Sequence, residues 1–341
     1  MNKILKTLGM LLLVVILGCA VMYVVLELSN RNTNDEKVYE ELEIYTLSGP
    51  TGFAVSKLAE SKDYKLIVQD APDKVSAALI KGDAMFATIP SNLAAILNKK
   101  TGGKIKILSV ISEGNLYVMS TNPDIKSVDD LKGKTVTLSG AGATPEVIAR
   151  DLLGSDVTLD FKSEHAECVA MLKSGKAETI ILPEPYVTIC KKQVPEVQVA
   201  VDLAKAYEDK HGDLLPMSVL VFNSDYLSFE TADEILDDFG NDGNVETLPY
   251  VTGEDRISKL LNDVKESIHF ANSNPQDAAK IIEDNGIIGL VGVAESSIPG
   301  CKLKFKAASD SKELITKYFE IINGIYPDLI GGAVPSEEIY Y

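Results

Sequence analysis

The 341-residue chain contains no tryptophan and only three arginines, Arg31, Arg150 and Arg256. Without tryptophan it lacks the side chain that stacks most strongly on a cationic ligand. With so few guanidinium groups, an anion site would depend mainly on backbone N–H groups, hydroxyl groups or lysines. The 50 acidic against 33 basic residues give a net charge of −17, and no basic run offsets it. Nucleic acid is therefore not expected as a partner.

Cysteine is also scarce, with Cys19, Cys168, Cys190 and Cys301 as the four positions. The spacing of the last three matches no metal site, and His165 near Cys168 would supply only one pair of ligands. Cys168 and Cys190 would form a disulfide if their helices faced each other, but buried free thiols are the favoured interpretation. We therefore predict no metal and no cofactor.

The first 28 residues predict a signal sequence or a membrane anchor. Two lysines precede an uncharged apolar stretch, residues 8–26, which is about long enough to span a bilayer as an uncleaved helix. Within it, "ILGC" ending at Cys19 resembles the lipobox of bacterial lipoproteins, in which this cysteine is lipidated. Either alternative would tether the chain by its N-terminus to the outer face of the cytoplasmic membrane. The polar residues 29–39 predict a flexible tether.

The hydrophobic content of 45% and charged content of 24% are typical of a globular protein. Beyond residue 40, strand and helix patterns alternate. "YKLIVQD" and "AMFATIP" predict strands, and the helices "PDKVSAALIKGD" and "PSNLAAILNKK" follow them in turn. This order indicates an α/β fold with a largely parallel sheet and helices on its faces.

The pattern occurs twice. Residues 64–90 align without gaps on residues 157–183, at an offset of 93 positions. The matched glycine, alanine and proline fall at a helix end, a strand start and a strand end. Upstream, "LSGPTG" from residue 47 has a counterpart in "LSGAGATP" from residue 138. We therefore predict two similar α/β lobes.

Four strand-to-helix junctions are the candidate binding elements. In open α/β sheets, ligands bind beyond the carboxyl ends of the strands, where loops enter helices. A helix start leaves about four N–H groups unpaired, and glycines allow a ligand to approach them. A cleft between the lobes would bring the four junctions together. The candidate ligand-binding residues are Ser48, Gly49, Pro50, Thr51, Gly52, Ser91, Asn92, Ser139, Gly140, Ala141, Gly142, Thr144, Glu184 and Tyr186.

Some of these residues also have a structural interpretation. Ser48 or Thr51 would cap the following helix in a simple tight turn. Glu184 would either stabilise the start of its own helix or bind a cationic or hydrogen-donating part of a ligand. Tyr186 would stack on a ring or pack in the core. A bulky residue at Gly52 or Gly142 is expected to abolish binding and leave folding largely intact.

From about residue 40 to its end, the chain resembles the solute-binding proteins of ABC importers. The resemblance is to the branch similar to nitrate, sulfonate, taurine and thiamine-precursor binders. The segments that carry it are "LSGPTGFAVSKLAE", "TIPSNLAAILNKKTGGKIKIL", "DLKGKTVTLSGAGATPE", "SEHAECVAMLKSGKAETIILPEPYV", "NPQDAAKII" and "IGGAVPSEEIYY". It implies the type 2 periplasmic-binding-protein fold, in which two α/β lobes joined by two crossing strands close over a ligand.

The resemblance implies lobe I at residues 40–117 and 219–341, and lobe II at residues 118–218. It also implies a monomeric, extracytoplasmic lipoprotein or anchored protein that is not an enzyme. Such a protein captures a small, anionic or zwitterionic organic solute by closure of its lobes. It then delivers the solute to the permease and ATPase subunits of an ABC importer.

Two alternatives remain open. One is an enzyme of the same fold, similar to thiamine-pyrimidine or menaquinone-pathway enzymes. Against it, the sequence predicts no histidine beside a nucleophile in the loops, since His165, His211 and His269 stand apart. The other is a membrane-tethered extracellular sensor domain, which would need a signalling partner.

Overall fold

The computed structural model describes residues 41–229, 252–289 and 292–341. The predicted signal or anchor, the tether and the proposed lipidation of Cys19 lie outside these ranges. Within them, no helix is both long enough and apolar enough to cross a membrane.

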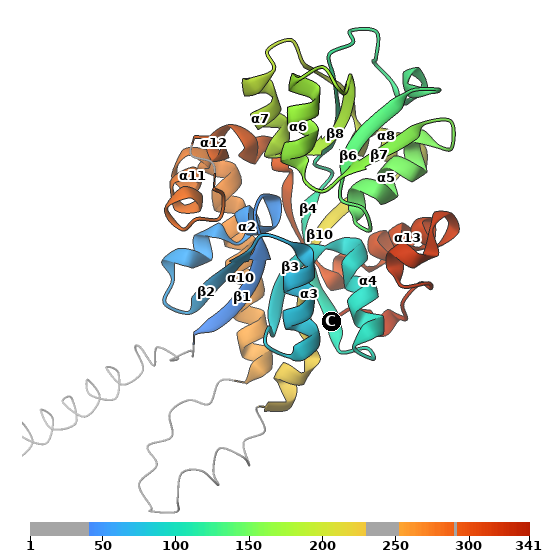
Figure 1. The fold of residues 1–341 in the computed structure, drawn as a ribbon. Helices are drawn as coiled ribbons and strands as arrows, with labels where there is room; N and C mark the ends of the chain where they lie inside the picture. Colours follow the sequence, from blue (N-terminus) through green and yellow to red (C-terminus); the bar gives the residue numbers. More distant parts are fainter. Residues whose placement is uncertain (1–40, 230–251, 290–291) are drawn as a thin grey trace, which may run out of the picture. The chain divides into compact units, whose positions relative to one another are not determined.

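Two mixed β-sheets, each covered by helices, form the described part of the chain (Figure 1). The first sheet has six strands in the order β11-β4-β10-β3-β1-β2, and the second has five in the order β7-β6-β8-β5-β9. The strands of the first are β1 (Leu42–Leu47), β2 (Tyr64–Gln69), β3 (Phe86–Pro90), β4 (Ile105–Glu113), β10 (Pro216–Asn223) and β11 (Leu303–Ala307). Those of the second are β5 (Leu116–Ser120), β6 (Thr135–Ser139), β7 (Thr158–Lys162), β8 (Thr179–Pro183) and β9 (Gln198–Asp202).

Helices cover both faces of each sheet. On one face of the six-stranded sheet, the helices that contribute buried side chains are α2 (Pro50–Ala54), α10 (Gly253–Ser273), α11 (Pro275–Asp284) and α12 (Ala294–Ser297). On the other face they are α3 (Pro72–Lys81), α4 (Ser91–Lys100) and α13 (Ala308–Ile325). The five-stranded sheet packs against α5 (Thr144–Leu153) and α8 (Leu203–His211), and against α6 (His165–Lys173) and α7 (Tyr186–Gln193). The predicted α/β fold class is confirmed.

The repeated sequence pattern corresponds to repeated structure. The helix ends predicted at Gly82 and Gly175 are real, and both glycines have positive φ, 81° and 69°, which favours glycine because it has no Cβ. Read from β9, the second sheet runs β9-β5-β8-β6-β7. It matches the order β4-β10-β3-β1-β2 of the first sheet when β9 corresponds to β4 and β5 to β10.

The chain crosses between the sheets twice. It leaves β4 after Glu113 and enters β5 at Leu116, and it returns from α8 to β10, which begins at Pro216. β5 pairs antiparallel with β8, and β10 pairs antiparallel with β3. The expected pair of crossing strands is therefore present. The lobe boundaries at residues 117/118 and 218/219 fall inside β5 and β10 and remain a proposed division.

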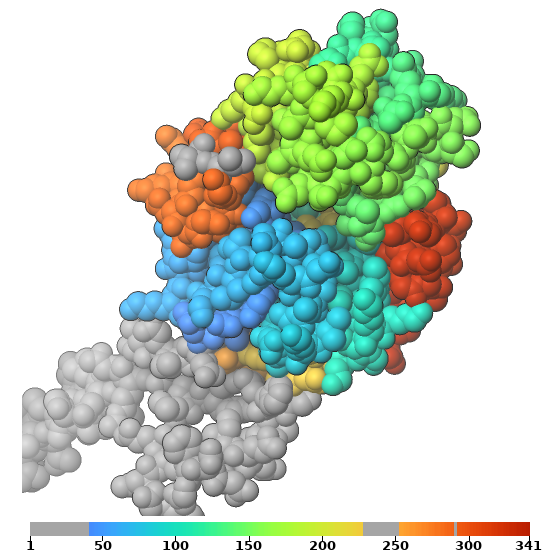
Figure 2. Space-filling view, in the orientation of Figure 1, coloured from blue at the N-terminus to red at the C-terminus, as the bar shows by residue number. Residues whose placement is uncertain are grey.

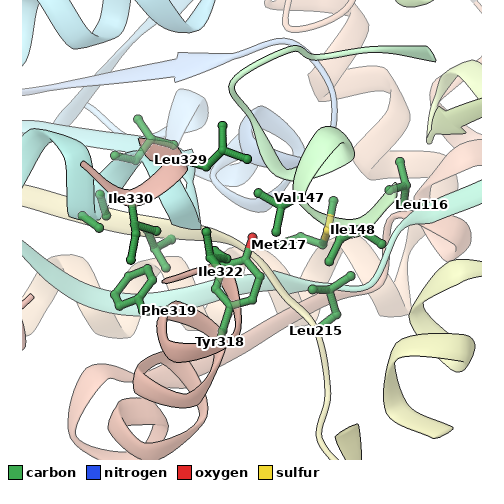
Figure 3. Close-up of a cluster of buried hydrophobic side chains, with 14 of the residues drawn as sticks. Leu116, Val147, Ile148, Leu215, Met217, Tyr318, Phe319, Ile322, Leu329 and Ile330 are labelled. Atoms are coloured by element: carbon green, nitrogen blue, oxygen red, sulfur yellow. The ribbon is translucent and has the colours of Figure 1, made fainter. Parts of the chain in front are cut away.

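One buried hydrophobic cluster extends over both sheets (Figure 3). In it, Val147 and Ile148 of α5 lie close to Tyr318 and Ile322 of α13. Because α5 packs on the second sheet and α13 on the first, this cluster joins the two lobes as well as filling them.

The three cysteines of the described chain, Cys168, Cys190 and Cys301, are buried free thiols. Cys168 and Cys190 lie in one apolar cluster between α6, α7 and β8, and burial raises the pKa of both thiols to about 11. The interpretation as free thiols is confirmed.

Candidate functional site

The first predicted junction follows β1. Its turn depends on Gly49, which has φ 90° and stands immediately before α2. Ser48 is exposed, and Thr51 donates its hydroxyl hydrogen to the carbonyl of Leu47 at 3.1 Å. No side chain caps α2, so the expectation that Ser48 or Thr51 caps this helix is wrong. With only five residues, α2 has a weak helix dipole.

Close packing requires a glycine at position 52, which the sequence analysis did not predict. A Cβ at this position would lie 2.5 Å from Ile287 Cγ2 and 2.7 Å from the Leu47 carbonyl oxygen. The first atom belongs to a stiff branched side chain and the second to the backbone, so neither moves easily. A bulky residue at Gly52 would therefore disturb the fold. This geometry overturns our expectation that such a variant leaves folding largely intact.

The junction after β6 is held by a buried carboxylate. Gly140 and Gly142 have φ of 87° and 75°, and the Gly142 N–H donates to Glu146 Oε2 at 2.7 Å. Glu146 Oε1 accepts hydrogen bonds from Arg150, whose Nη2 lies 2.6 Å away. Ala141 and Gly142 are exposed, and a Cβ on Gly142 would meet no atom within 4 Å.

The junction after β3 reaches across to this loop. Asn92 is fully buried, and its Nδ2 donates to the carbonyls of Gly142, at 3.1 Å, and Leu329, at 3.0 Å. The Thr144 hydroxyl donates to Asn92 Oδ1 at 3.4 Å. The adjacent Ser91 is also fully buried, and its hydroxyl has no hydrogen-bond partner among the described residues.

The remaining pair of junctions also meet. A Cβ on Gly49 would lie 3.3 Å from Pro185 Cδ and 3.9 Å from the Glu184 carbonyl oxygen. The structure therefore brings residues 48–52 against 183–186, and residues 90–92 against 139–145. On the face drawn in Figure 2, a narrow hollow separates the region coloured green from the region coloured blue.

Glu184 turns toward its own helix. Its carboxylate accepts the Thr188 N–H and the Thr188 hydroxyl, both at 3.1 Å, at the start of α7. The side chain is 6% exposed and lies against Gly300, where a Cβ would come within 2.8 Å of it. Burial raises the pKa of Glu184, and the hydrogen bonds from Thr188 oppose that shift. The peptide bond to Pro185 is cis.

His165 is a residue of this region that the sequence analysis left out. Its Nδ1 lies 2.5 Å from Ser139 Oγ, and its ring centroid is 5.0 Å from that of Tyr186. The expectation that no histidine stands beside a nucleophile in the loops is therefore wrong. His165 is the first residue of α6, the helix that follows β7. The four predicted junctions do not include the one between β7 and α6. Burial lowers the pKa of His165 to about 4, so the ring is neutral near pH 7.

Positive charge is scarce at these junctions. None of the residues from 48 to 52, 90 to 92, 139 to 145 and 183 to 186 is lysine or arginine, and Glu184 is their one acidic member. Arg150 is bound to Glu146, and the nearby Lys162 is bound to Asp160 at 2.9 Å. The arrangement can therefore offer hydroxyls, amides and backbone N–H groups to a ligand, but few cations.

Two cavities lie elsewhere in the described chain. One, of about 330 Å³, is lined by residues that include Gly114, Asp202 and Lys302 at the crossing between the sheets. The other, of about 630 Å³, is lined by residues that include Arg150 and Tyr326. Neither lining contains a predicted ligand-binding residue. Within the same described ranges, no three His, Cys, Asp or Glu side chains gather in a way that could hold a metal ion.

Comparison with known proteins agrees with the fold. The family model described as NMT1/THI5 like matches residues 63–156. No curated protein matches the chain in sequence.

Among solved structures, an ABC transporter from Parabacteroides distasonis is similar at a TM-score of 0.70 and 22% identity, covering 88% of this chain and 98% of its own. The periplasmic aliphatic sulphonate binding protein SsuA from Escherichia coli has a TM-score of 0.63 at 14% identity, covering 89% and 92%. The periplasmic nitrate-binding protein NrtA from Synechocystis PCC 6803 has a TM-score of 0.51 at 13% identity, covering 88% and 92%. These matches confirm the predicted fold, two α/β lobes of the periplasmic-binding-protein type, and they agree with the resemblance read from the sequence.

Proposed function

We propose that the chain is the extracytoplasmic solute-binding component of an ABC importer. The observation that carries this proposal is the pairing of four strand-to-helix junctions across two similar lobes. A single glycine turn would be weak support, because such turns are common in loops. Four junctions that meet in two pairs, in a fold similar to that of sulphonate- and nitrate-binding proteins, are stronger support.

The proposed mechanism is closure of the lobes on a small organic solute. A solute that contacts both lobes stabilises the closed form by the extra contacts made only there. Hydroxyl groups and helix N-termini would hold an anionic or zwitterionic group. Ser91 is well placed for this role, because a buried hydroxyl without a protein partner normally bonds to water or to a ligand.

We propose binding rather than catalysis for the Ser139–His165 pair. A serine nucleophile needs a histidine base that a third group orients. Ser139 is the hydrogen-bond partner of His165 among the described residues, and it occupies Nδ1, the atom that an orienting carboxylate would use. In this proposal, His165 holds the Ser139 hydroxyl in place for a solute.

The membrane attachment belongs to the same proposal. Residues 1–39 would tether the chain as a monomer outside the cytoplasmic membrane, by a lipidated Cys19 or by an uncleaved helix. From there it would deliver its solute to permease and ATPase subunits. The polar composition of residues 29–39 supports a tether of this kind.

A thermal-shift screen of the full-length chain in detergent tests the proposal. The probes are an alkanesulfonate, taurine, nitrate and a substituted pyrimidine, each added at millimolar concentration. A solute at 100 times its Kd stabilises the folded state by about 2.7 kcal/mol, so one class should raise the melting temperature clearly. Native mass spectrometry should then find one unaltered solute per chain. Turnover of the compound would contradict the proposal.

Two matched serine variants locate the site. Ser91 and Ser109 are both fully buried, and neither hydroxyl has a hydrogen-bond partner among the described residues. Ser91 lies at a junction, whereas Ser109 lies in β4. We expect Ser91→Ala to weaken binding of the identified solute about tenfold, the value of one lost hydrogen bond. Ser109→Ala should bind normally. Equal affinity in both variants would remove this junction from the site.

A further inference from the structure

Asn92 is committed to protein contacts rather than left open to a solute. A primary amide has two N–H donors, and both donors of Asn92 bond to backbone carbonyls, those of Gly142 and Leu329. A solute could take these donors only by breaking a contact between protein segments. This observation sets Asn92 apart from Ser91, whose hydroxyl has no partner in the described chain.

The two carbonyls lie on opposite sides of the proposed cleft. Gly142 belongs to the loop between β6 and α5, at the second sheet. Leu329 belongs to the short 3-10 helix η5 (Pro327–Ile330), which packs on α4 and α13 at the first sheet. One buried amide group therefore spans the two lobes.

Further contacts close this link into a ring. The Gly142 N–H is held by Glu146, which binds Arg150, and the Arg150 guanidinium carbon lies 5.1 Å from the ring centroid of Tyr326. Tyr326 directly precedes η5, whose Leu329 returns to Asn92. We name this ring the Asn92 latch; its members are Asn92, Gly142, Glu146, Arg150, Tyr326 and Leu329.

We infer that Asn92 is a positioning residue, which holds the glycine loop of lobe II against lobe I and so stabilises the closed form. This inference rests on the proposed function, because it assigns the closing contact of that same site. Opening the lobes would break the bond to Gly142 and the weaker one from Thr144. Water would replace these partners only in part, so the closed form is favoured by about tenfold over a chain without the amide.

Hydrogen exchange of the full-length chain without any solute tests the inference. In Asn92→Ala, we expect peptides covering residues 139–147 to exchange about tenfold faster than in the wild type. Residues 48–54 and 183–188 should also exchange faster, although the side-chain hydrogen bonds of Asn92 go to Gly142, Leu329 and Thr144, because opening the lobes exposes both pairs of junctions. Faster exchange confined to the first turns of α4 would overturn the inference.

Asn98 supplies the matched control. It lies on the same helix, and its Nδ2 donates to the carbonyl of Ile105 at 2.8 Å, within lobe I. Asn98→Ala should therefore accelerate exchange near residues 98–105 and leave residues 139–147 and 183–188 unchanged. Thr144→Val removes the hydrogen bond that lobe II donates to Asn92, with little change in side-chain shape. We expect it to accelerate hydrogen exchange at the same junctions, but by less than Asn92→Ala does.

The outcome is separate from that of the solute screen, since exchange is measured on the free protein. If the screen fails, the exchange pattern still supports or overturns the latch. If a solute is found, Asn92→Ala should raise its dissociation rate about tenfold and leave its association rate unchanged. A slower association rate with unchanged dissociation would contradict a latch.

Discussion

The two lobes share a strand order but differ at every junction that follows it. In lobe I, β3 leads into Ser91 and Asn92; in lobe II, the corresponding strand β8 leads into Glu184 and Pro185, at the same offset of 93 positions. Asn92 reaches across to the other lobe, whereas the Glu184 side chain returns to its own helix. The two lobes therefore share a strand order but carry different side chains where the corresponding strands end.

Gly52 of lobe I and Gly142 of lobe II, in the two glycine-rich junctions, also differ in their surroundings. Gly52 is enclosed by Ile287 and the Leu47 carbonyl, whereas Gly142 has open space and a positive φ of 75°. The first glycine is required because there is no room for a Cβ, and the second because of its backbone conformation. Similar sequence signals therefore have different physical causes in the two lobes, and single substitutions should separate them.

The largest effect is expected at the enclosed glycine. Gly52→Ala forces a Cβ against a stiff side chain and a backbone oxygen, and should lower the free energy of unfolding by about 3 kcal/mol. Gly142→Ala places a Cβ in open space but on a residue with left-handed backbone, which should lower the free energy of unfolding by only about 1 kcal/mol. Urea denaturation of both variants measures the difference. Equal losses at the two positions would contradict the proposed division of roles.

The next effect concerns the third strand-to-helix junction. The helix α6 begins at His165, whereas its counterpart α3 begins at Pro72, so of these two helix starts that of lobe II carries the histidine. The pKa of His165 is about 4 in the folded chain against 6.5 ordinarily. Between these two pH values the unfolded chain binds more protons than the folded chain. The stability that the neutral ring contributes is therefore fully present only above pH 6.5. About 2 to 3 kcal/mol should be lost as the pH falls from 6.5 to 4.

Denaturation curves between pH 4 and 7 measure this loss. His165→Gln should remove it from the pH profile, because glutamine does not titrate. His269, which is exposed on α10, provides the control, and His269→Gln should keep the wild-type profile. A profile that is unchanged in His165→Gln would show that burial of this ring does not set the pH dependence.

The smallest effect is expected at Glu184, the counterpart of Ser91. Burial raises its pKa above the ordinary 4.5, so the folded state favours the protonated carboxyl. This contribution to stability is present at low pH and is lost as the pH rises through the folded-state pKa. Glu184→Gln should therefore gain stability relative to the wild type as the pH increases from 4.5. A difference between the two chains that stays constant with pH would contradict this, and the surface variant Glu196→Gln serves as the control.

Much of the fold was predictable because its signals are local. The helix ends at Gly82 and Gly175 and the strand ends at Pro90 and Pro183 lie where the repeated pattern placed them. The site was less accessible. The sequence does not reveal that His165 contacts Ser139, because the two are 26 positions apart, and the packing role of Gly52 involves Ile287, far along the chain.

The sequence by itself determined the α/β order, the repeat of that order and the shortage of cationic groups at the junctions. These properties follow from residue types and short-range periodicity, which act within a few turns of chain. Only the tertiary structure decided that Asn92 meets Gly142, that Gly49 meets Pro185 and that His165 meets Ser139. Such pairings depend on how two sheets and their covering helices pack, and no local pattern encodes the partner that packing supplies.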